Sequence, residues 1–300
     1  MNIILRALAI ALLLAPASVS AQCTSRPVLA MTYNIRLDTT ADGANAWTYR
    51  KDFLFNQIAS MRPEILGLQE VLLNQKRDLE VAFPGYRFVG VGRDDSKEQG
   101  EFSPLAFDSS QFQIRESGTF WLSTSPALPS LGWDAGYKRL VTWARLIRKG
   151  DRTRLLVLNT HWDHQGLVAR RESGKLVLSW LGKNRQRNER LVLLGDFNAD
   201  ESEESVAQLT ADRASGSALF DTRTISATGS AGPSFSFNAF NAFPATGKLI
   251  DHIFVGTGIG VRMHAVIAQH ENGRVASDHF PVVALLDIPS RAGQSCRATG

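Results

Sequence analysis

The sequence predicts an α/β protein in which two mixed sheets pack against each other and helices lie on their outer faces. Short apolar runs of strand length recur along the chain, and they are too many and too unevenly spaced for a simple alternation of strand and helix. Hydrophobic residues make up 44% of the sequence and charged residues 21%, which is typical of a protein with a sizeable core. Because no internal repeat or low-complexity linker divides the 300 residues, we expect a single domain.

In the first half of the chain, two helices are expected among five strands. Residues 50–61 carry apolar side chains at helical spacing, and Pro63 prevents the helix from continuing. Residues 74–83 form a shorter helix that ends before Pro84. Apolar runs bounded by turn residues predict strands at 28–35, 64–71, 86–91, 104–108 and 112–121.

In the second half, one amphipathic helix is expected at 166–184 among six strands. The basic run GKNRQRNER (182–190) ends this helix. Such runs are usually solvated helix ends, where positive charge is favourable, and phosphate binding is the second interpretation. The strands are predicted at 139–148, 153–160, 190–198, 248–255, 260–269 and 280–288.

The first 21 residues predict a secretory signal peptide. One basic residue is followed by an apolar run, and Val19-Ser20-Ala21 satisfies the small-x-small rule for cleavage. The apolar run is too short to span a membrane comfortably, and no later segment is long and apolar enough to do so. We therefore expect an exported protein, periplasmic or secreted, in which residues 22–300 form the folded domain.

The sequence contains two cysteines, Cys23 and Cys296, which lie at the two ends of the mature chain. Export would place them in an oxidising compartment, so a disulfide between them is plausible. It would close nearly the whole chain into one loop and stabilise the fold by roughly 4–5 kcal/mol in the chain-entropy model. Two free thiols are the alternative.

The net charge argues against nucleic acid as the main partner. The full chain has a formal charge of +4, and removal of Arg6 with the signal peptide leaves 32 basic and 29 acidic residues, or +3. A protein that follows long nucleic acid needs a broader basic surface, because phosphate contacts dominate such binding. Nucleic acid is therefore the alternative partner rather than the favoured one. As for oligomeric state, we expect a monomer.

Six of the apolar runs end in, or border on, carboxylate, amide or imidazole side chains. A single polar residue at a strand end is usually a cap or a turn residue, and all of them could be caps. If the six ends converge on one rim, they form a cleft rich in carboxylates and histidines. The residues are Asn34, Gln69, Glu70, His161, Asp163, Asp196, Asn198, Asp251, His252, Asp278 and His279.

These side chains favour metal-assisted hydrolysis of a phosphate ester. Carboxylates and an asparagine oxygen are hard ligands that suit Mg²⁺, with Mn²⁺ as the alternative. An imidazole paired with a carboxylate can activate water beside such a cation. Without a G-x-S-x-G elbow, a P-loop or a zinc-type cysteine and histidine pattern, other common hydrolase and nucleotide-binding sites have little support.

The motifs TYNI, LQEV, NTHWDH, GDFN, IDHIF and SDHFPV occur in the same order as in one known family. The chain resembles the endonuclease/exonuclease/phosphatase superfamily, which has the DNase I-like fold, from about Val28 to Leu286. The resemblance implies a four-layered α/β/β/α sandwich, in agreement with the two-sheet expectation.

The resemblance also implies roles for the metal-binding residues. Glu70 matches the principal Mg²⁺ ligand of the family, and Asn34 matches its partner in the metal site. Asp278 matches a further carboxylate at or near the metal. Mg²⁺ is therefore the expected cofactor, and a phosphate ester the expected substrate.

A second set of roles concerns catalysis. The resemblance implies that His279 contacts phosphate and acts as the base, with Asp251 as its orienting partner. Asp196 and Asn198 match the pair that positions the attacking water and the phosphate. His161 matches a histidine that stabilises phosphoryl charge or protonates the leaving group.

Three further residues are candidates for the substrate or for supporting contacts. The chain is most similar to exported bacterial members described as metal-dependent hydrolases, in which Glu101 and Arg139 recur and either could line the cleft. For Glu101, an exposed loop acid is the alternative. Asp163 is expected to orient His161, and a structural role is expected for His164.

The expected reaction is hydrolysis of a phosphodiester or phosphomonoester of a small or lipid-like alcohol. A secreted nuclease acting on DNA or RNA is one alternative, and a non-catalytic binding protein on the same fold is another. Aromatic rings near the rim could stack on an organic leaving group or pack into the core. These are Trp47, Tyr49, Trp121, Trp133 and Trp162.

Overall fold

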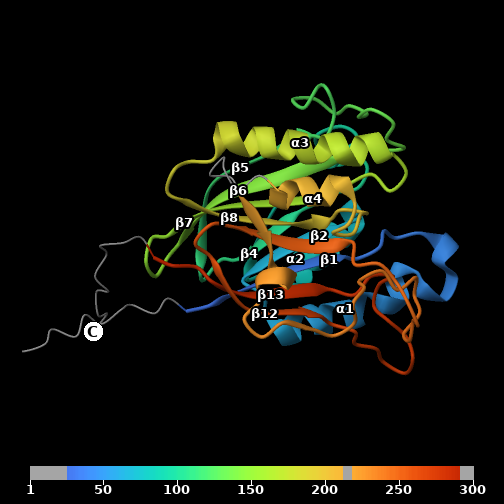
Figure 1. Ribbon diagram of the computed structural model, residues 1–300. Helices are drawn as coiled ribbons and strands as arrows, with labels where there is room; N and C mark the ends of the chain where they lie inside the picture. Colours follow the sequence, from blue (N-terminus) through green and yellow to red (C-terminus); the bar gives the residue numbers. More distant parts are fainter. Residues whose placement is uncertain (1–25, 212–217, 291–300) are drawn as a thin grey trace, which may run out of the picture.

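The structure is a computed structural model that describes residues 26–211 and 218–290 (Figure 1). Two sheets pack face to face and helices cover them from outside. Two helices, α1 (Trp47–Met61) and α2 (Leu73–Ala82), lie against one sheet, and two others, α3 (Leu167–Asn184) and α4 (Glu204–Ala211), lie against the other. The two-sheet α/β sandwich that the sequence predicts is confirmed.

The first sheet has seven strands and contains both ends of the described chain. Their order is β10 (Ser230–Ala231), β12 (Gly260–Val266), β13 (Val282–Asp287), β1 (Val28–Asn34), β2 (Ile65–Gln69), β4 (Leu105–Asp108) and β3 (Tyr86–Val89). β1 pairs in parallel with β2 and antiparallel with β13, so the sheet is mixed.

The second sheet has six strands and is mixed as well. Their order is β5 (Phe112–Trp121), β6 (Leu140–Arg148), β7 (Arg154–His161), β8 (Glu189–Asp196), β11 (Asp251–Gly256) and β9 (Leu219–Asp221). β7 and β8 run parallel, whereas β11 runs antiparallel to β8.

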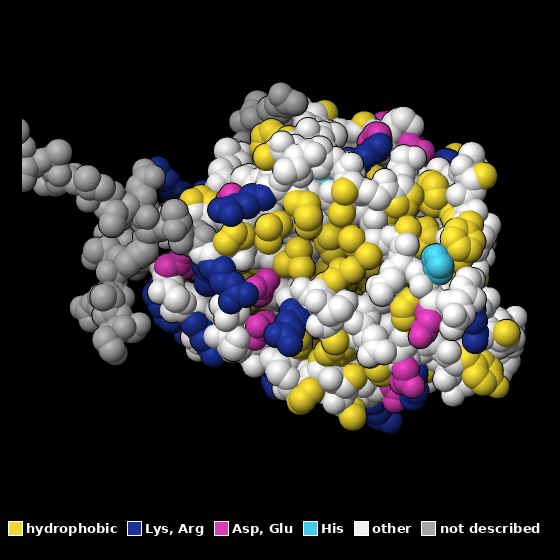
Figure 2. All heavy atoms as spheres, turned by 90° about the horizontal axis from the view of Figure 1, so that it is seen from below, with side chains coloured by type: hydrophobic (Ala, Val, Ile, Leu, Met, Phe, Trp, Pro, Cys, Tyr) yellow, Lys and Arg dark blue, Asp and Glu magenta, His cyan; other side chains and the backbone are white. Residues whose placement is uncertain are grey.

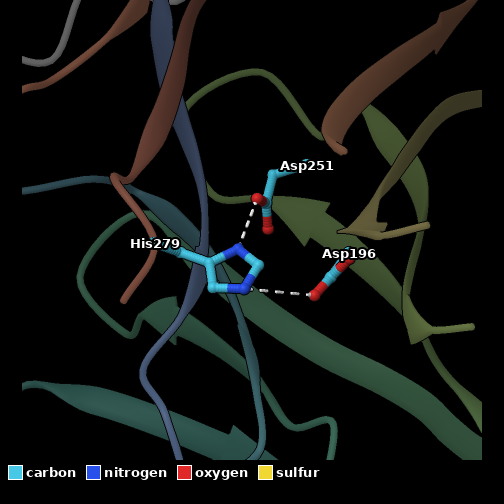
Figure 3. A group of neighbouring side chains, drawn as sticks. All are labelled: Asp196, Asp251 and His279. Carbon is cyan, nitrogen blue, oxygen red and sulfur yellow. Dashed lines mark hydrogen bonds and ion pairs between the residues drawn. The ribbon is translucent and has the colours of Figure 1, made fainter. Parts of the chain in front are cut away.

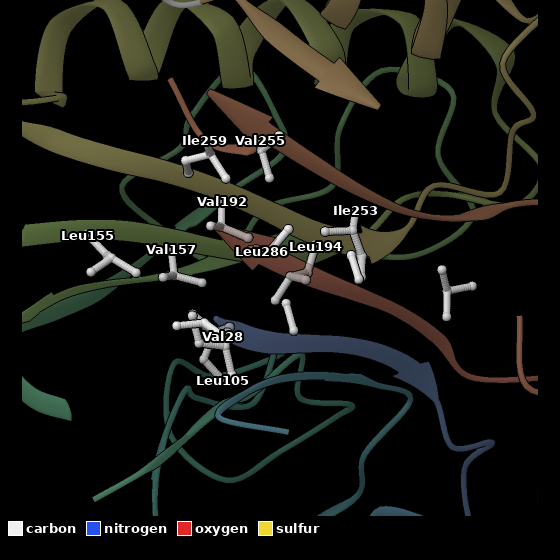
Figure 4. Close-up of a cluster of buried hydrophobic side chains, with 14 of the residues drawn as sticks. Val28, Leu105, Leu155, Val157, Val192, Leu194, Ile253, Val255, Ile259 and Leu286 are labelled. Carbon is white, nitrogen blue, oxygen red and sulfur yellow. The ribbon is translucent and has the colours of Figure 1, made fainter. Parts of the chain in front are cut away.

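Alternation along the strands builds the layers. Successive side chains of a strand point to opposite faces, so every second residue of a central strand faces the other sheet. Val157 and Val192 of one sheet and Val28 of the other belong to this inner cluster (Figure 4). Each of them is at most 3% exposed, and burial of such a side chain contributes about 1.5–3 kcal/mol.

The alternate residues of the same strands pack under the helices. Met31 and Tyr33 of β1 contact the cluster that contains Leu54 of α1. On the other side, Leu158 of β7 belongs to the cluster that contains Val177 of α3. Strands that are apolar on both faces explain the continuous hydrophobic runs of the sequence.

Several short elements were not predicted from the sequence. Besides α4, β9 and β10, these are a 3₁₀ helix at Thr40–Asn45 and α5 at Thr222–Ile225. With two to eight residues each, they are too short to show a hydrophobic period. The predicted strand at 248–255 is also too long, because it begins at Asp251 and the residues before it belong to a loop.

The signal peptide and the disulfide are the predictions that concern the two ends of the chain. The first and last strands pair, with Val28 opposite Leu286, so the described chain begins and ends at the same side of the sandwich. The signal peptide at 1–21, Cys23 and Cys296 lie outside the described residues, and the disulfide stays a prediction. Among the described residues, no helix has the length and apolar character needed to cross a membrane.

Candidate active site

Strand register brings the predicted polar residues to one rim. Parallel pairing of β1 with β2 aligns Asn34 with Gln69, and parallel pairing of β7 with β8 aligns His161 with Asp196. Antiparallel β11 begins where β8 ends, which places Asp251 opposite Asp196. Because the two sheets face each other, the ends of their central strands form one cleft.

Three residues just beyond these strands have a left-handed backbone. The φ angles are +56° at Arg36, +59° at Glu70 and +49° at Asn198. Such angles are uncommon for residues other than glycine and are retained where the surroundings enforce them. Arg50 of α1 holds the backbone at Arg36 in place, since its guanidinium donates to the carbonyl oxygens of Ile35 and Arg36. Each strained residue lines the cleft.

The cleft has a volume of about 640 Å³. Of the eleven site residues predicted from the sequence, eight line it: Glu70, Glu101, Arg139, His161, Asp196, Asn198, Asp278 and His279. The other three, Asn34, Asp163 and Asp251, are at most 1% exposed and support lining residues.

The pair Asp251–His279 lies at the centre of the site (Figure 3). His279 Nδ1 is 2.8 Å from Asp251 Oδ2, which leaves Nε2 directed toward Asp196 Oδ2 at 3.8 Å. Burial lowers the pKa of His279, but the charges of Asp251 and Asp196 outweigh this effect and raise it to about 10. At neutral pH, when no cation is bound, the ring is therefore a positively charged imidazolium with a proton on each nitrogen.

The pKa of Asp196 is also shifted far from its usual value. Burial and the charge of Asp251 raise its pKa to about 7, although His279 and a hydrogen bond from Asn34 act in the opposite direction. Its Oδ1 atom accepts a hydrogen bond from the backbone N–H of Asn198. A carboxyl with this pKa can hold or release a proton near neutrality, as acid–base catalysis requires.

Asn34 holds two carboxylates in place. Its Nδ2 group donates to Glu70 Oε1 at 3.0 Å and to Asp196 Oδ2 at 2.9 Å. Its Oδ1 atom accepts from the backbone N–H of Arg36 at 3.0 Å, so a direct bond to a metal would have to replace that hydrogen bond. In this geometry Asn34 is a positioning residue, which differs from the ligand role expected from the sequence.

Glu70 and Asp278 provide a donor set that fits a hard cation. Their carboxylates lie on either side of the Arg36 guanidinium, at 3.8 and 3.9 Å, beyond hydrogen-bond length. Arg36 is instead engaged by Asp42 in a bidentate pair. Burial, with the charge of Glu70, raises the pKa of Asp278. A divalent cation such as Mg²⁺ would offset the negative charge that raises the pKa of Asp278.

A second group could also hold a metal. One ligand atom each from Asp196, Asp251 and His279 lies within 4.8 Å of the others. In this group, however, Asp251 Oδ2 and His279 Nδ1 already form a short hydrogen bond, and the imidazolium supplies the positive charge. Glu70 and Asp278 are therefore the better fit for a cation, and the Asp–His group is the better fit for proton chemistry.

His161 lies between two carboxylates. Its Nε2 atom is 3.5 Å from Asp196 Oδ2, and its Nδ1 atom is 3.8 Å from Glu101 Oε2. Burial and the nearby charges of Arg139 and Arg93 lower the pKa of His161 well below its usual value. The ring is neutral at pH 7 and can donate a hydrogen bond. Glu101 is not an exposed loop acid, because it lines the cleft in a 2.8 Å ion pair with Arg93.

Asp163 does not orient His161, in contrast to the expectation. Its Oδ1 atom accepts from the backbone N–H groups of Gln165 and Gly166, and its Oδ2 atom from Tyr137 N and Arg139 Nε. It therefore fixes the loop after β7 and the guanidinium of Arg139. That guanidinium is 5% exposed, and its Nη1 group has no hydrogen-bond partner, although the side chain lines the cleft.

The aromatic side chains of the cleft are Tyr137 and Phe237, and none of the five aromatic residues considered from the sequence lines it, in agreement with the packing alternative. Trp47, Trp121 and Trp162 are buried. The Tyr137 ring stacks on His164, and the edge of Phe237 packs on His279 with ring centres 5.2 Å apart. His164 lines the cleft and contacts Arg139, so its expected role as a purely structural residue is not supported.

Sequence reasoning gave no role in the cleft to eight of its residues, of which His164 was expected to be structural and the others were not considered: Arg36, Leu37, Tyr137, His164, Phe237, Gly247, Lys248 and Ile250. Arg36 follows Asn34 by two residues, and His164 follows His161 by three, so their position after a strand was a usable signal. The other residues lie on loops or just before a strand, where no hydrophobic period indicates which side chain faces the cleft.

With this geometry established, comparison with known proteins identifies the family. A model described as "Endonuclease/Exonuclease/phosphatase family" matches residues 31–279. The chain belongs to this family. Its members are hydrolases of phosphoric esters, and this chain is a hydrolase of the same family. No curated protein matches the chain.

Solved structures support the assignment. A mannosyl-6-phosphatase of Bacteroides thetaiotaomicron VPI-5482 is 32% identical, over 86% of this chain and 99% of its own, with a TM-score of 0.80. An endonuclease/exonuclease/phosphatase of Bacteroides vulgatus is 33% identical, over 88% of this chain and 100% of its own, with a TM-score of 0.83. TDP2 of D. rerio, complexed with a single-strand DNA product, is 16% identical (88% and 100% covered, TM-score 0.69), which shows similarity of fold alone.

Proposed function

We propose that this family member is an exported, Mg²⁺-dependent phosphohydrolase that acts on a phosphorylated small alcohol, with a sugar phosphate monoester as the favoured substrate. The observation that carries the proposal is the Asp251–His279 pair, whose open Nε2 atom faces a cleft that also contains Glu70 and Asp278. Acid–base groups and hard-cation ligands are thus combined in one cavity.

Glu70 and Asp278 would hold the cation. When bound, Mg²⁺ would supply positive charge against the phosphoryl oxygens. The protein supplies the other positive and hydrogen-bonding groups around the phosphate. Arg139 Nη1 is a buried donor without a partner, and a buried donor left unpaired costs about 1–3 kcal/mol, which a phosphate oxygen would offset. Neutral His161 donates a further hydrogen bond.

His279 and Asp196 manage the proton of the attacking water. Their facing atoms are 3.8 Å apart, and the pKa of Asp196 is about 7, so these groups can exchange a proton near neutral pH. Asp251 fixes the imidazole, and once Nε2 has given its proton to Asp196 it can accept the proton of the water. Asn198, held by its hydrogen bond to Trp162 O, keeps its place beside Asp196.

The preference for a small substrate rests on the cleft and on one relative. A volume of about 640 Å³ is the size of a small-molecule site. Tyr137 and Phe237 offer apolar ring surface, and Lys248 and His164 offer polar groups, a combination that suits a sugar ring. The name of the B. thetaiotaomicron relative, a mannosyl-6-phosphatase, supports the same class. Export is proposed from residues 1–21, which have the composition of a signal peptide.

The test uses the mature chain, residues 22–300. Hydrolysis of p-nitrophenyl phosphate, bis-p-nitrophenyl phosphate and mannose 6-phosphate is measured in Mg²⁺, in Mn²⁺ and in EDTA. We expect turnover in the metals, none in EDTA, and a loss of about 10³-fold in kcat for His279→Ala. His270→Ala, at an exposed histidine, is the matched control and keeps full activity.

Each alternative gives a different result. Turnover that survives EDTA would contradict the metal dependence. Cleavage of plasmid DNA or RNA together with inertness toward all three esters would identify a nuclease. A folded protein that binds mannose 6-phosphate but turns over none of these substrates would identify a binding protein.

A further inference from the structure

The basic run that ends α3 lies far from the cleft. It belongs to a second concavity of about 600 Å³. Eight of its ten lining residues lie at the starts of β7 and β8 or in the turns that precede these strands, and the other two are Ile147 of β6 and Pro289 after β13. Five of its ten lining residues are arginines: Arg152, Arg154, Arg185, Arg187 and Arg190. The mature chain as a whole has a net charge near +3, so this concentration of positive charge is local.

The concavity and the catalytic cleft lie at opposite ends of the same two strands. Arg154 is aligned with Glu189 at one end, and His161 is aligned with Asp196 at the other. Seven residues of extended strand correspond to roughly 23 Å at about 3.3 Å per residue. No side chain can reach from one site into the other, so the arginines take no part in the reaction.

Among the described residues that line the concavity, a single acidic side chain accompanies five arginines. Its one acidic residue, Glu189, is 3% exposed and already accepts from Arg145 Nε at 2.9 Å and from Gln186 N at 2.8 Å. Within the described parts of the chain, no carboxylate forms an ion pair with the four arginines at positions 152, 154, 187 and 190. Like charges therefore face one another across a hollow, and a bound anion would relieve their repulsion.

Backbone contacts hold the side chain of one of the arginines, Arg185. Arg185 donates from Nε and Nη2 to the carbonyl oxygen of Glu189, at 3.3 and 3.1 Å. Burial lowers its pKa, the charge of Glu189 opposes this, and the charge of Arg190 lowers it further. Arg152 has a φ of +59°, a conformation that glycine or asparagine adopts more readily. An arginine at that turn position is costly for the backbone, and no carboxylate in the described part of the chain pairs with it.

The chemistry of the lining indicates the kind of ligand. Its apolar members are Ile147, which is 8% exposed, and Pro289, so the lining offers no aromatic ring on which a base could stack and no exposed large apolar residue to enter a membrane. The planar guanidinium fork matches the oxygens of phosphate and sulfate. Seen from below, many Lys and Arg side chains lie toward the left-hand end of the molecule (Figure 2).

We propose that this concavity is a second anion site, which binds the phosphate or sulfate groups of a compact, multiply charged ligand at the end of the sandwich opposite the active site. The site does not depend on the proposed catalytic function. A small ligand is favoured over a polymer because the surface is concave and enclosed by side chains from separate turns, at 150–154 and 185–190.

The test measures binding of two probes by calorimetry in EDTA. Inorganic tripolyphosphate represents phosphate ligands, and sucrose octasulfate represents sulfate esters. The double variant Arg154→Glu, Arg187→Glu reverses two exposed charges of the concavity. The control Arg87→Glu, Arg115→Glu makes the same change in net charge at exposed arginines outside it. Because tripolyphosphate also fits the active site, all titrations are repeated in the His279→Ala background and with excess mannose 6-phosphate.

We expect the wild-type protein and the control to bind at least one probe at a site that mannose 6-phosphate does not occupy. The Arg154→Glu, Arg187→Glu variant should bind there at least tenfold more weakly, with hydrolysis of p-nitrophenyl phosphate unchanged. Equal weakening in the control would show a general effect of net charge and overturn the proposal. Binding of anionic vesicles or single-stranded RNA, with neither small probe bound, would overturn it in favour of a macromolecular surface.

Discussion

Two aspartate–histidine pairs start from neighbouring residues of β11, and they have different consequences. Asp251 pairs with His279 at 2.8 Å, and His252 pairs with Asp221 at 3.0 Å. Both pairs are buried. Because successive residues of a strand point to opposite faces, the first pair faces the cleft and the second faces the helical layer.

The difference lies in the second nitrogen of each imidazole. His252 Nε2 lies 3.1 Å from the carbonyl oxygen of Ala199, and its ring stacks on Phe254, so both nitrogens are occupied within the core. His279 Nε2 instead faces the cleft, 3.8 Å from Asp196. A buried Asp–His pair is thus not by itself catalytic. We expect catalysis only from the pair whose second nitrogen is left to face the cleft.

The strongest test of this comparison is Asp251→Asn. We expect kcat to fall by about 10³-fold, since the amide no longer supports a proton on His279. Binding of Mn²⁺ at the carboxylates of Glu70 and Asp278 should be retained, as measured by electron paramagnetic resonance. A variant that loses Mn²⁺ binding would show that Asp196, Asp251 and His279 hold the metal, and the assignment of the two groups would then be reversed.

The complementary test is His252→Gln. Removal of one partner leaves a buried carboxylate unpaired, and we expect a loss of about 3 kcal/mol in the free energy of unfolding. The kcat of the folded protein should stay within about twofold, because the change lies on the other face of the sheet. Urea unfolding and assay of the same preparation provide both readouts. A large drop in kcat with unchanged stability would break the distinction between the pairs.

The stability that the Asp221–His252 pair contributes should depend on pH in a defined way. Burial lowers the pKa of His252, but Asp221 outweighs this and raises it, while the pKa of Asp221 is lowered despite its burial. The stabilisation from His252 is therefore complete below about pH 6.5 and is lost as the pH rises through the raised pKa. The stabilisation from Asp221 is present above about pH 4 and is lost as the pH falls through its lowered pKa. The stability difference between wild type and His252→Gln should be largest between these limits.

A smaller effect is expected from Arg139→Lys. Lysine keeps the charge but loses the unpaired Nη1 donor and the planar fork, so we expect kcat/KM to fall about tenfold, mainly through KM. Arg115→Lys, at an exposed arginine, is the control. Steady-state kinetics with mannose 6-phosphate and with p-nitrophenyl phosphate measure both parameters. Unchanged KM for both esters would remove Arg139 from the phosphate site.

Much of the site was predictable because polar residues interrupt apolar runs. Glu70, Asp196 and Asp278 stand out because polar residues recur at six strand ends of one chain, although a single polar strand end is usually a cap or a turn. Glu101 and Arg139 have no such signal and were identified through family resemblance alone. Tyr137, Phe237 and Lys248 could not be found, because their loops reach the cleft only in the folded chain.

Support roles were the hardest to predict. Asp163 lies two residues from His161 and was expected to orient it, yet its hydrogen bonds go to Arg139 and to backbone N–H groups. Asn34 was expected to bind metal, yet its amide bridges Glu70 and Asp196. Proximity along the chain does not decide which of several nearby groups a buried side chain contacts.

The sequence by itself determined the layers of this protein and the ends of the strands at which chemistry occurs. Both follow from local patterns: alternation of period two, apolar runs on central strands, and polar residues where those runs stop. Only the tertiary structure decided that Asp251 pairs with His279 while its neighbour His252 pairs with Asp221. Those partners are 28 and 31 residues away, and strand register and the packing of two sheets bring them together.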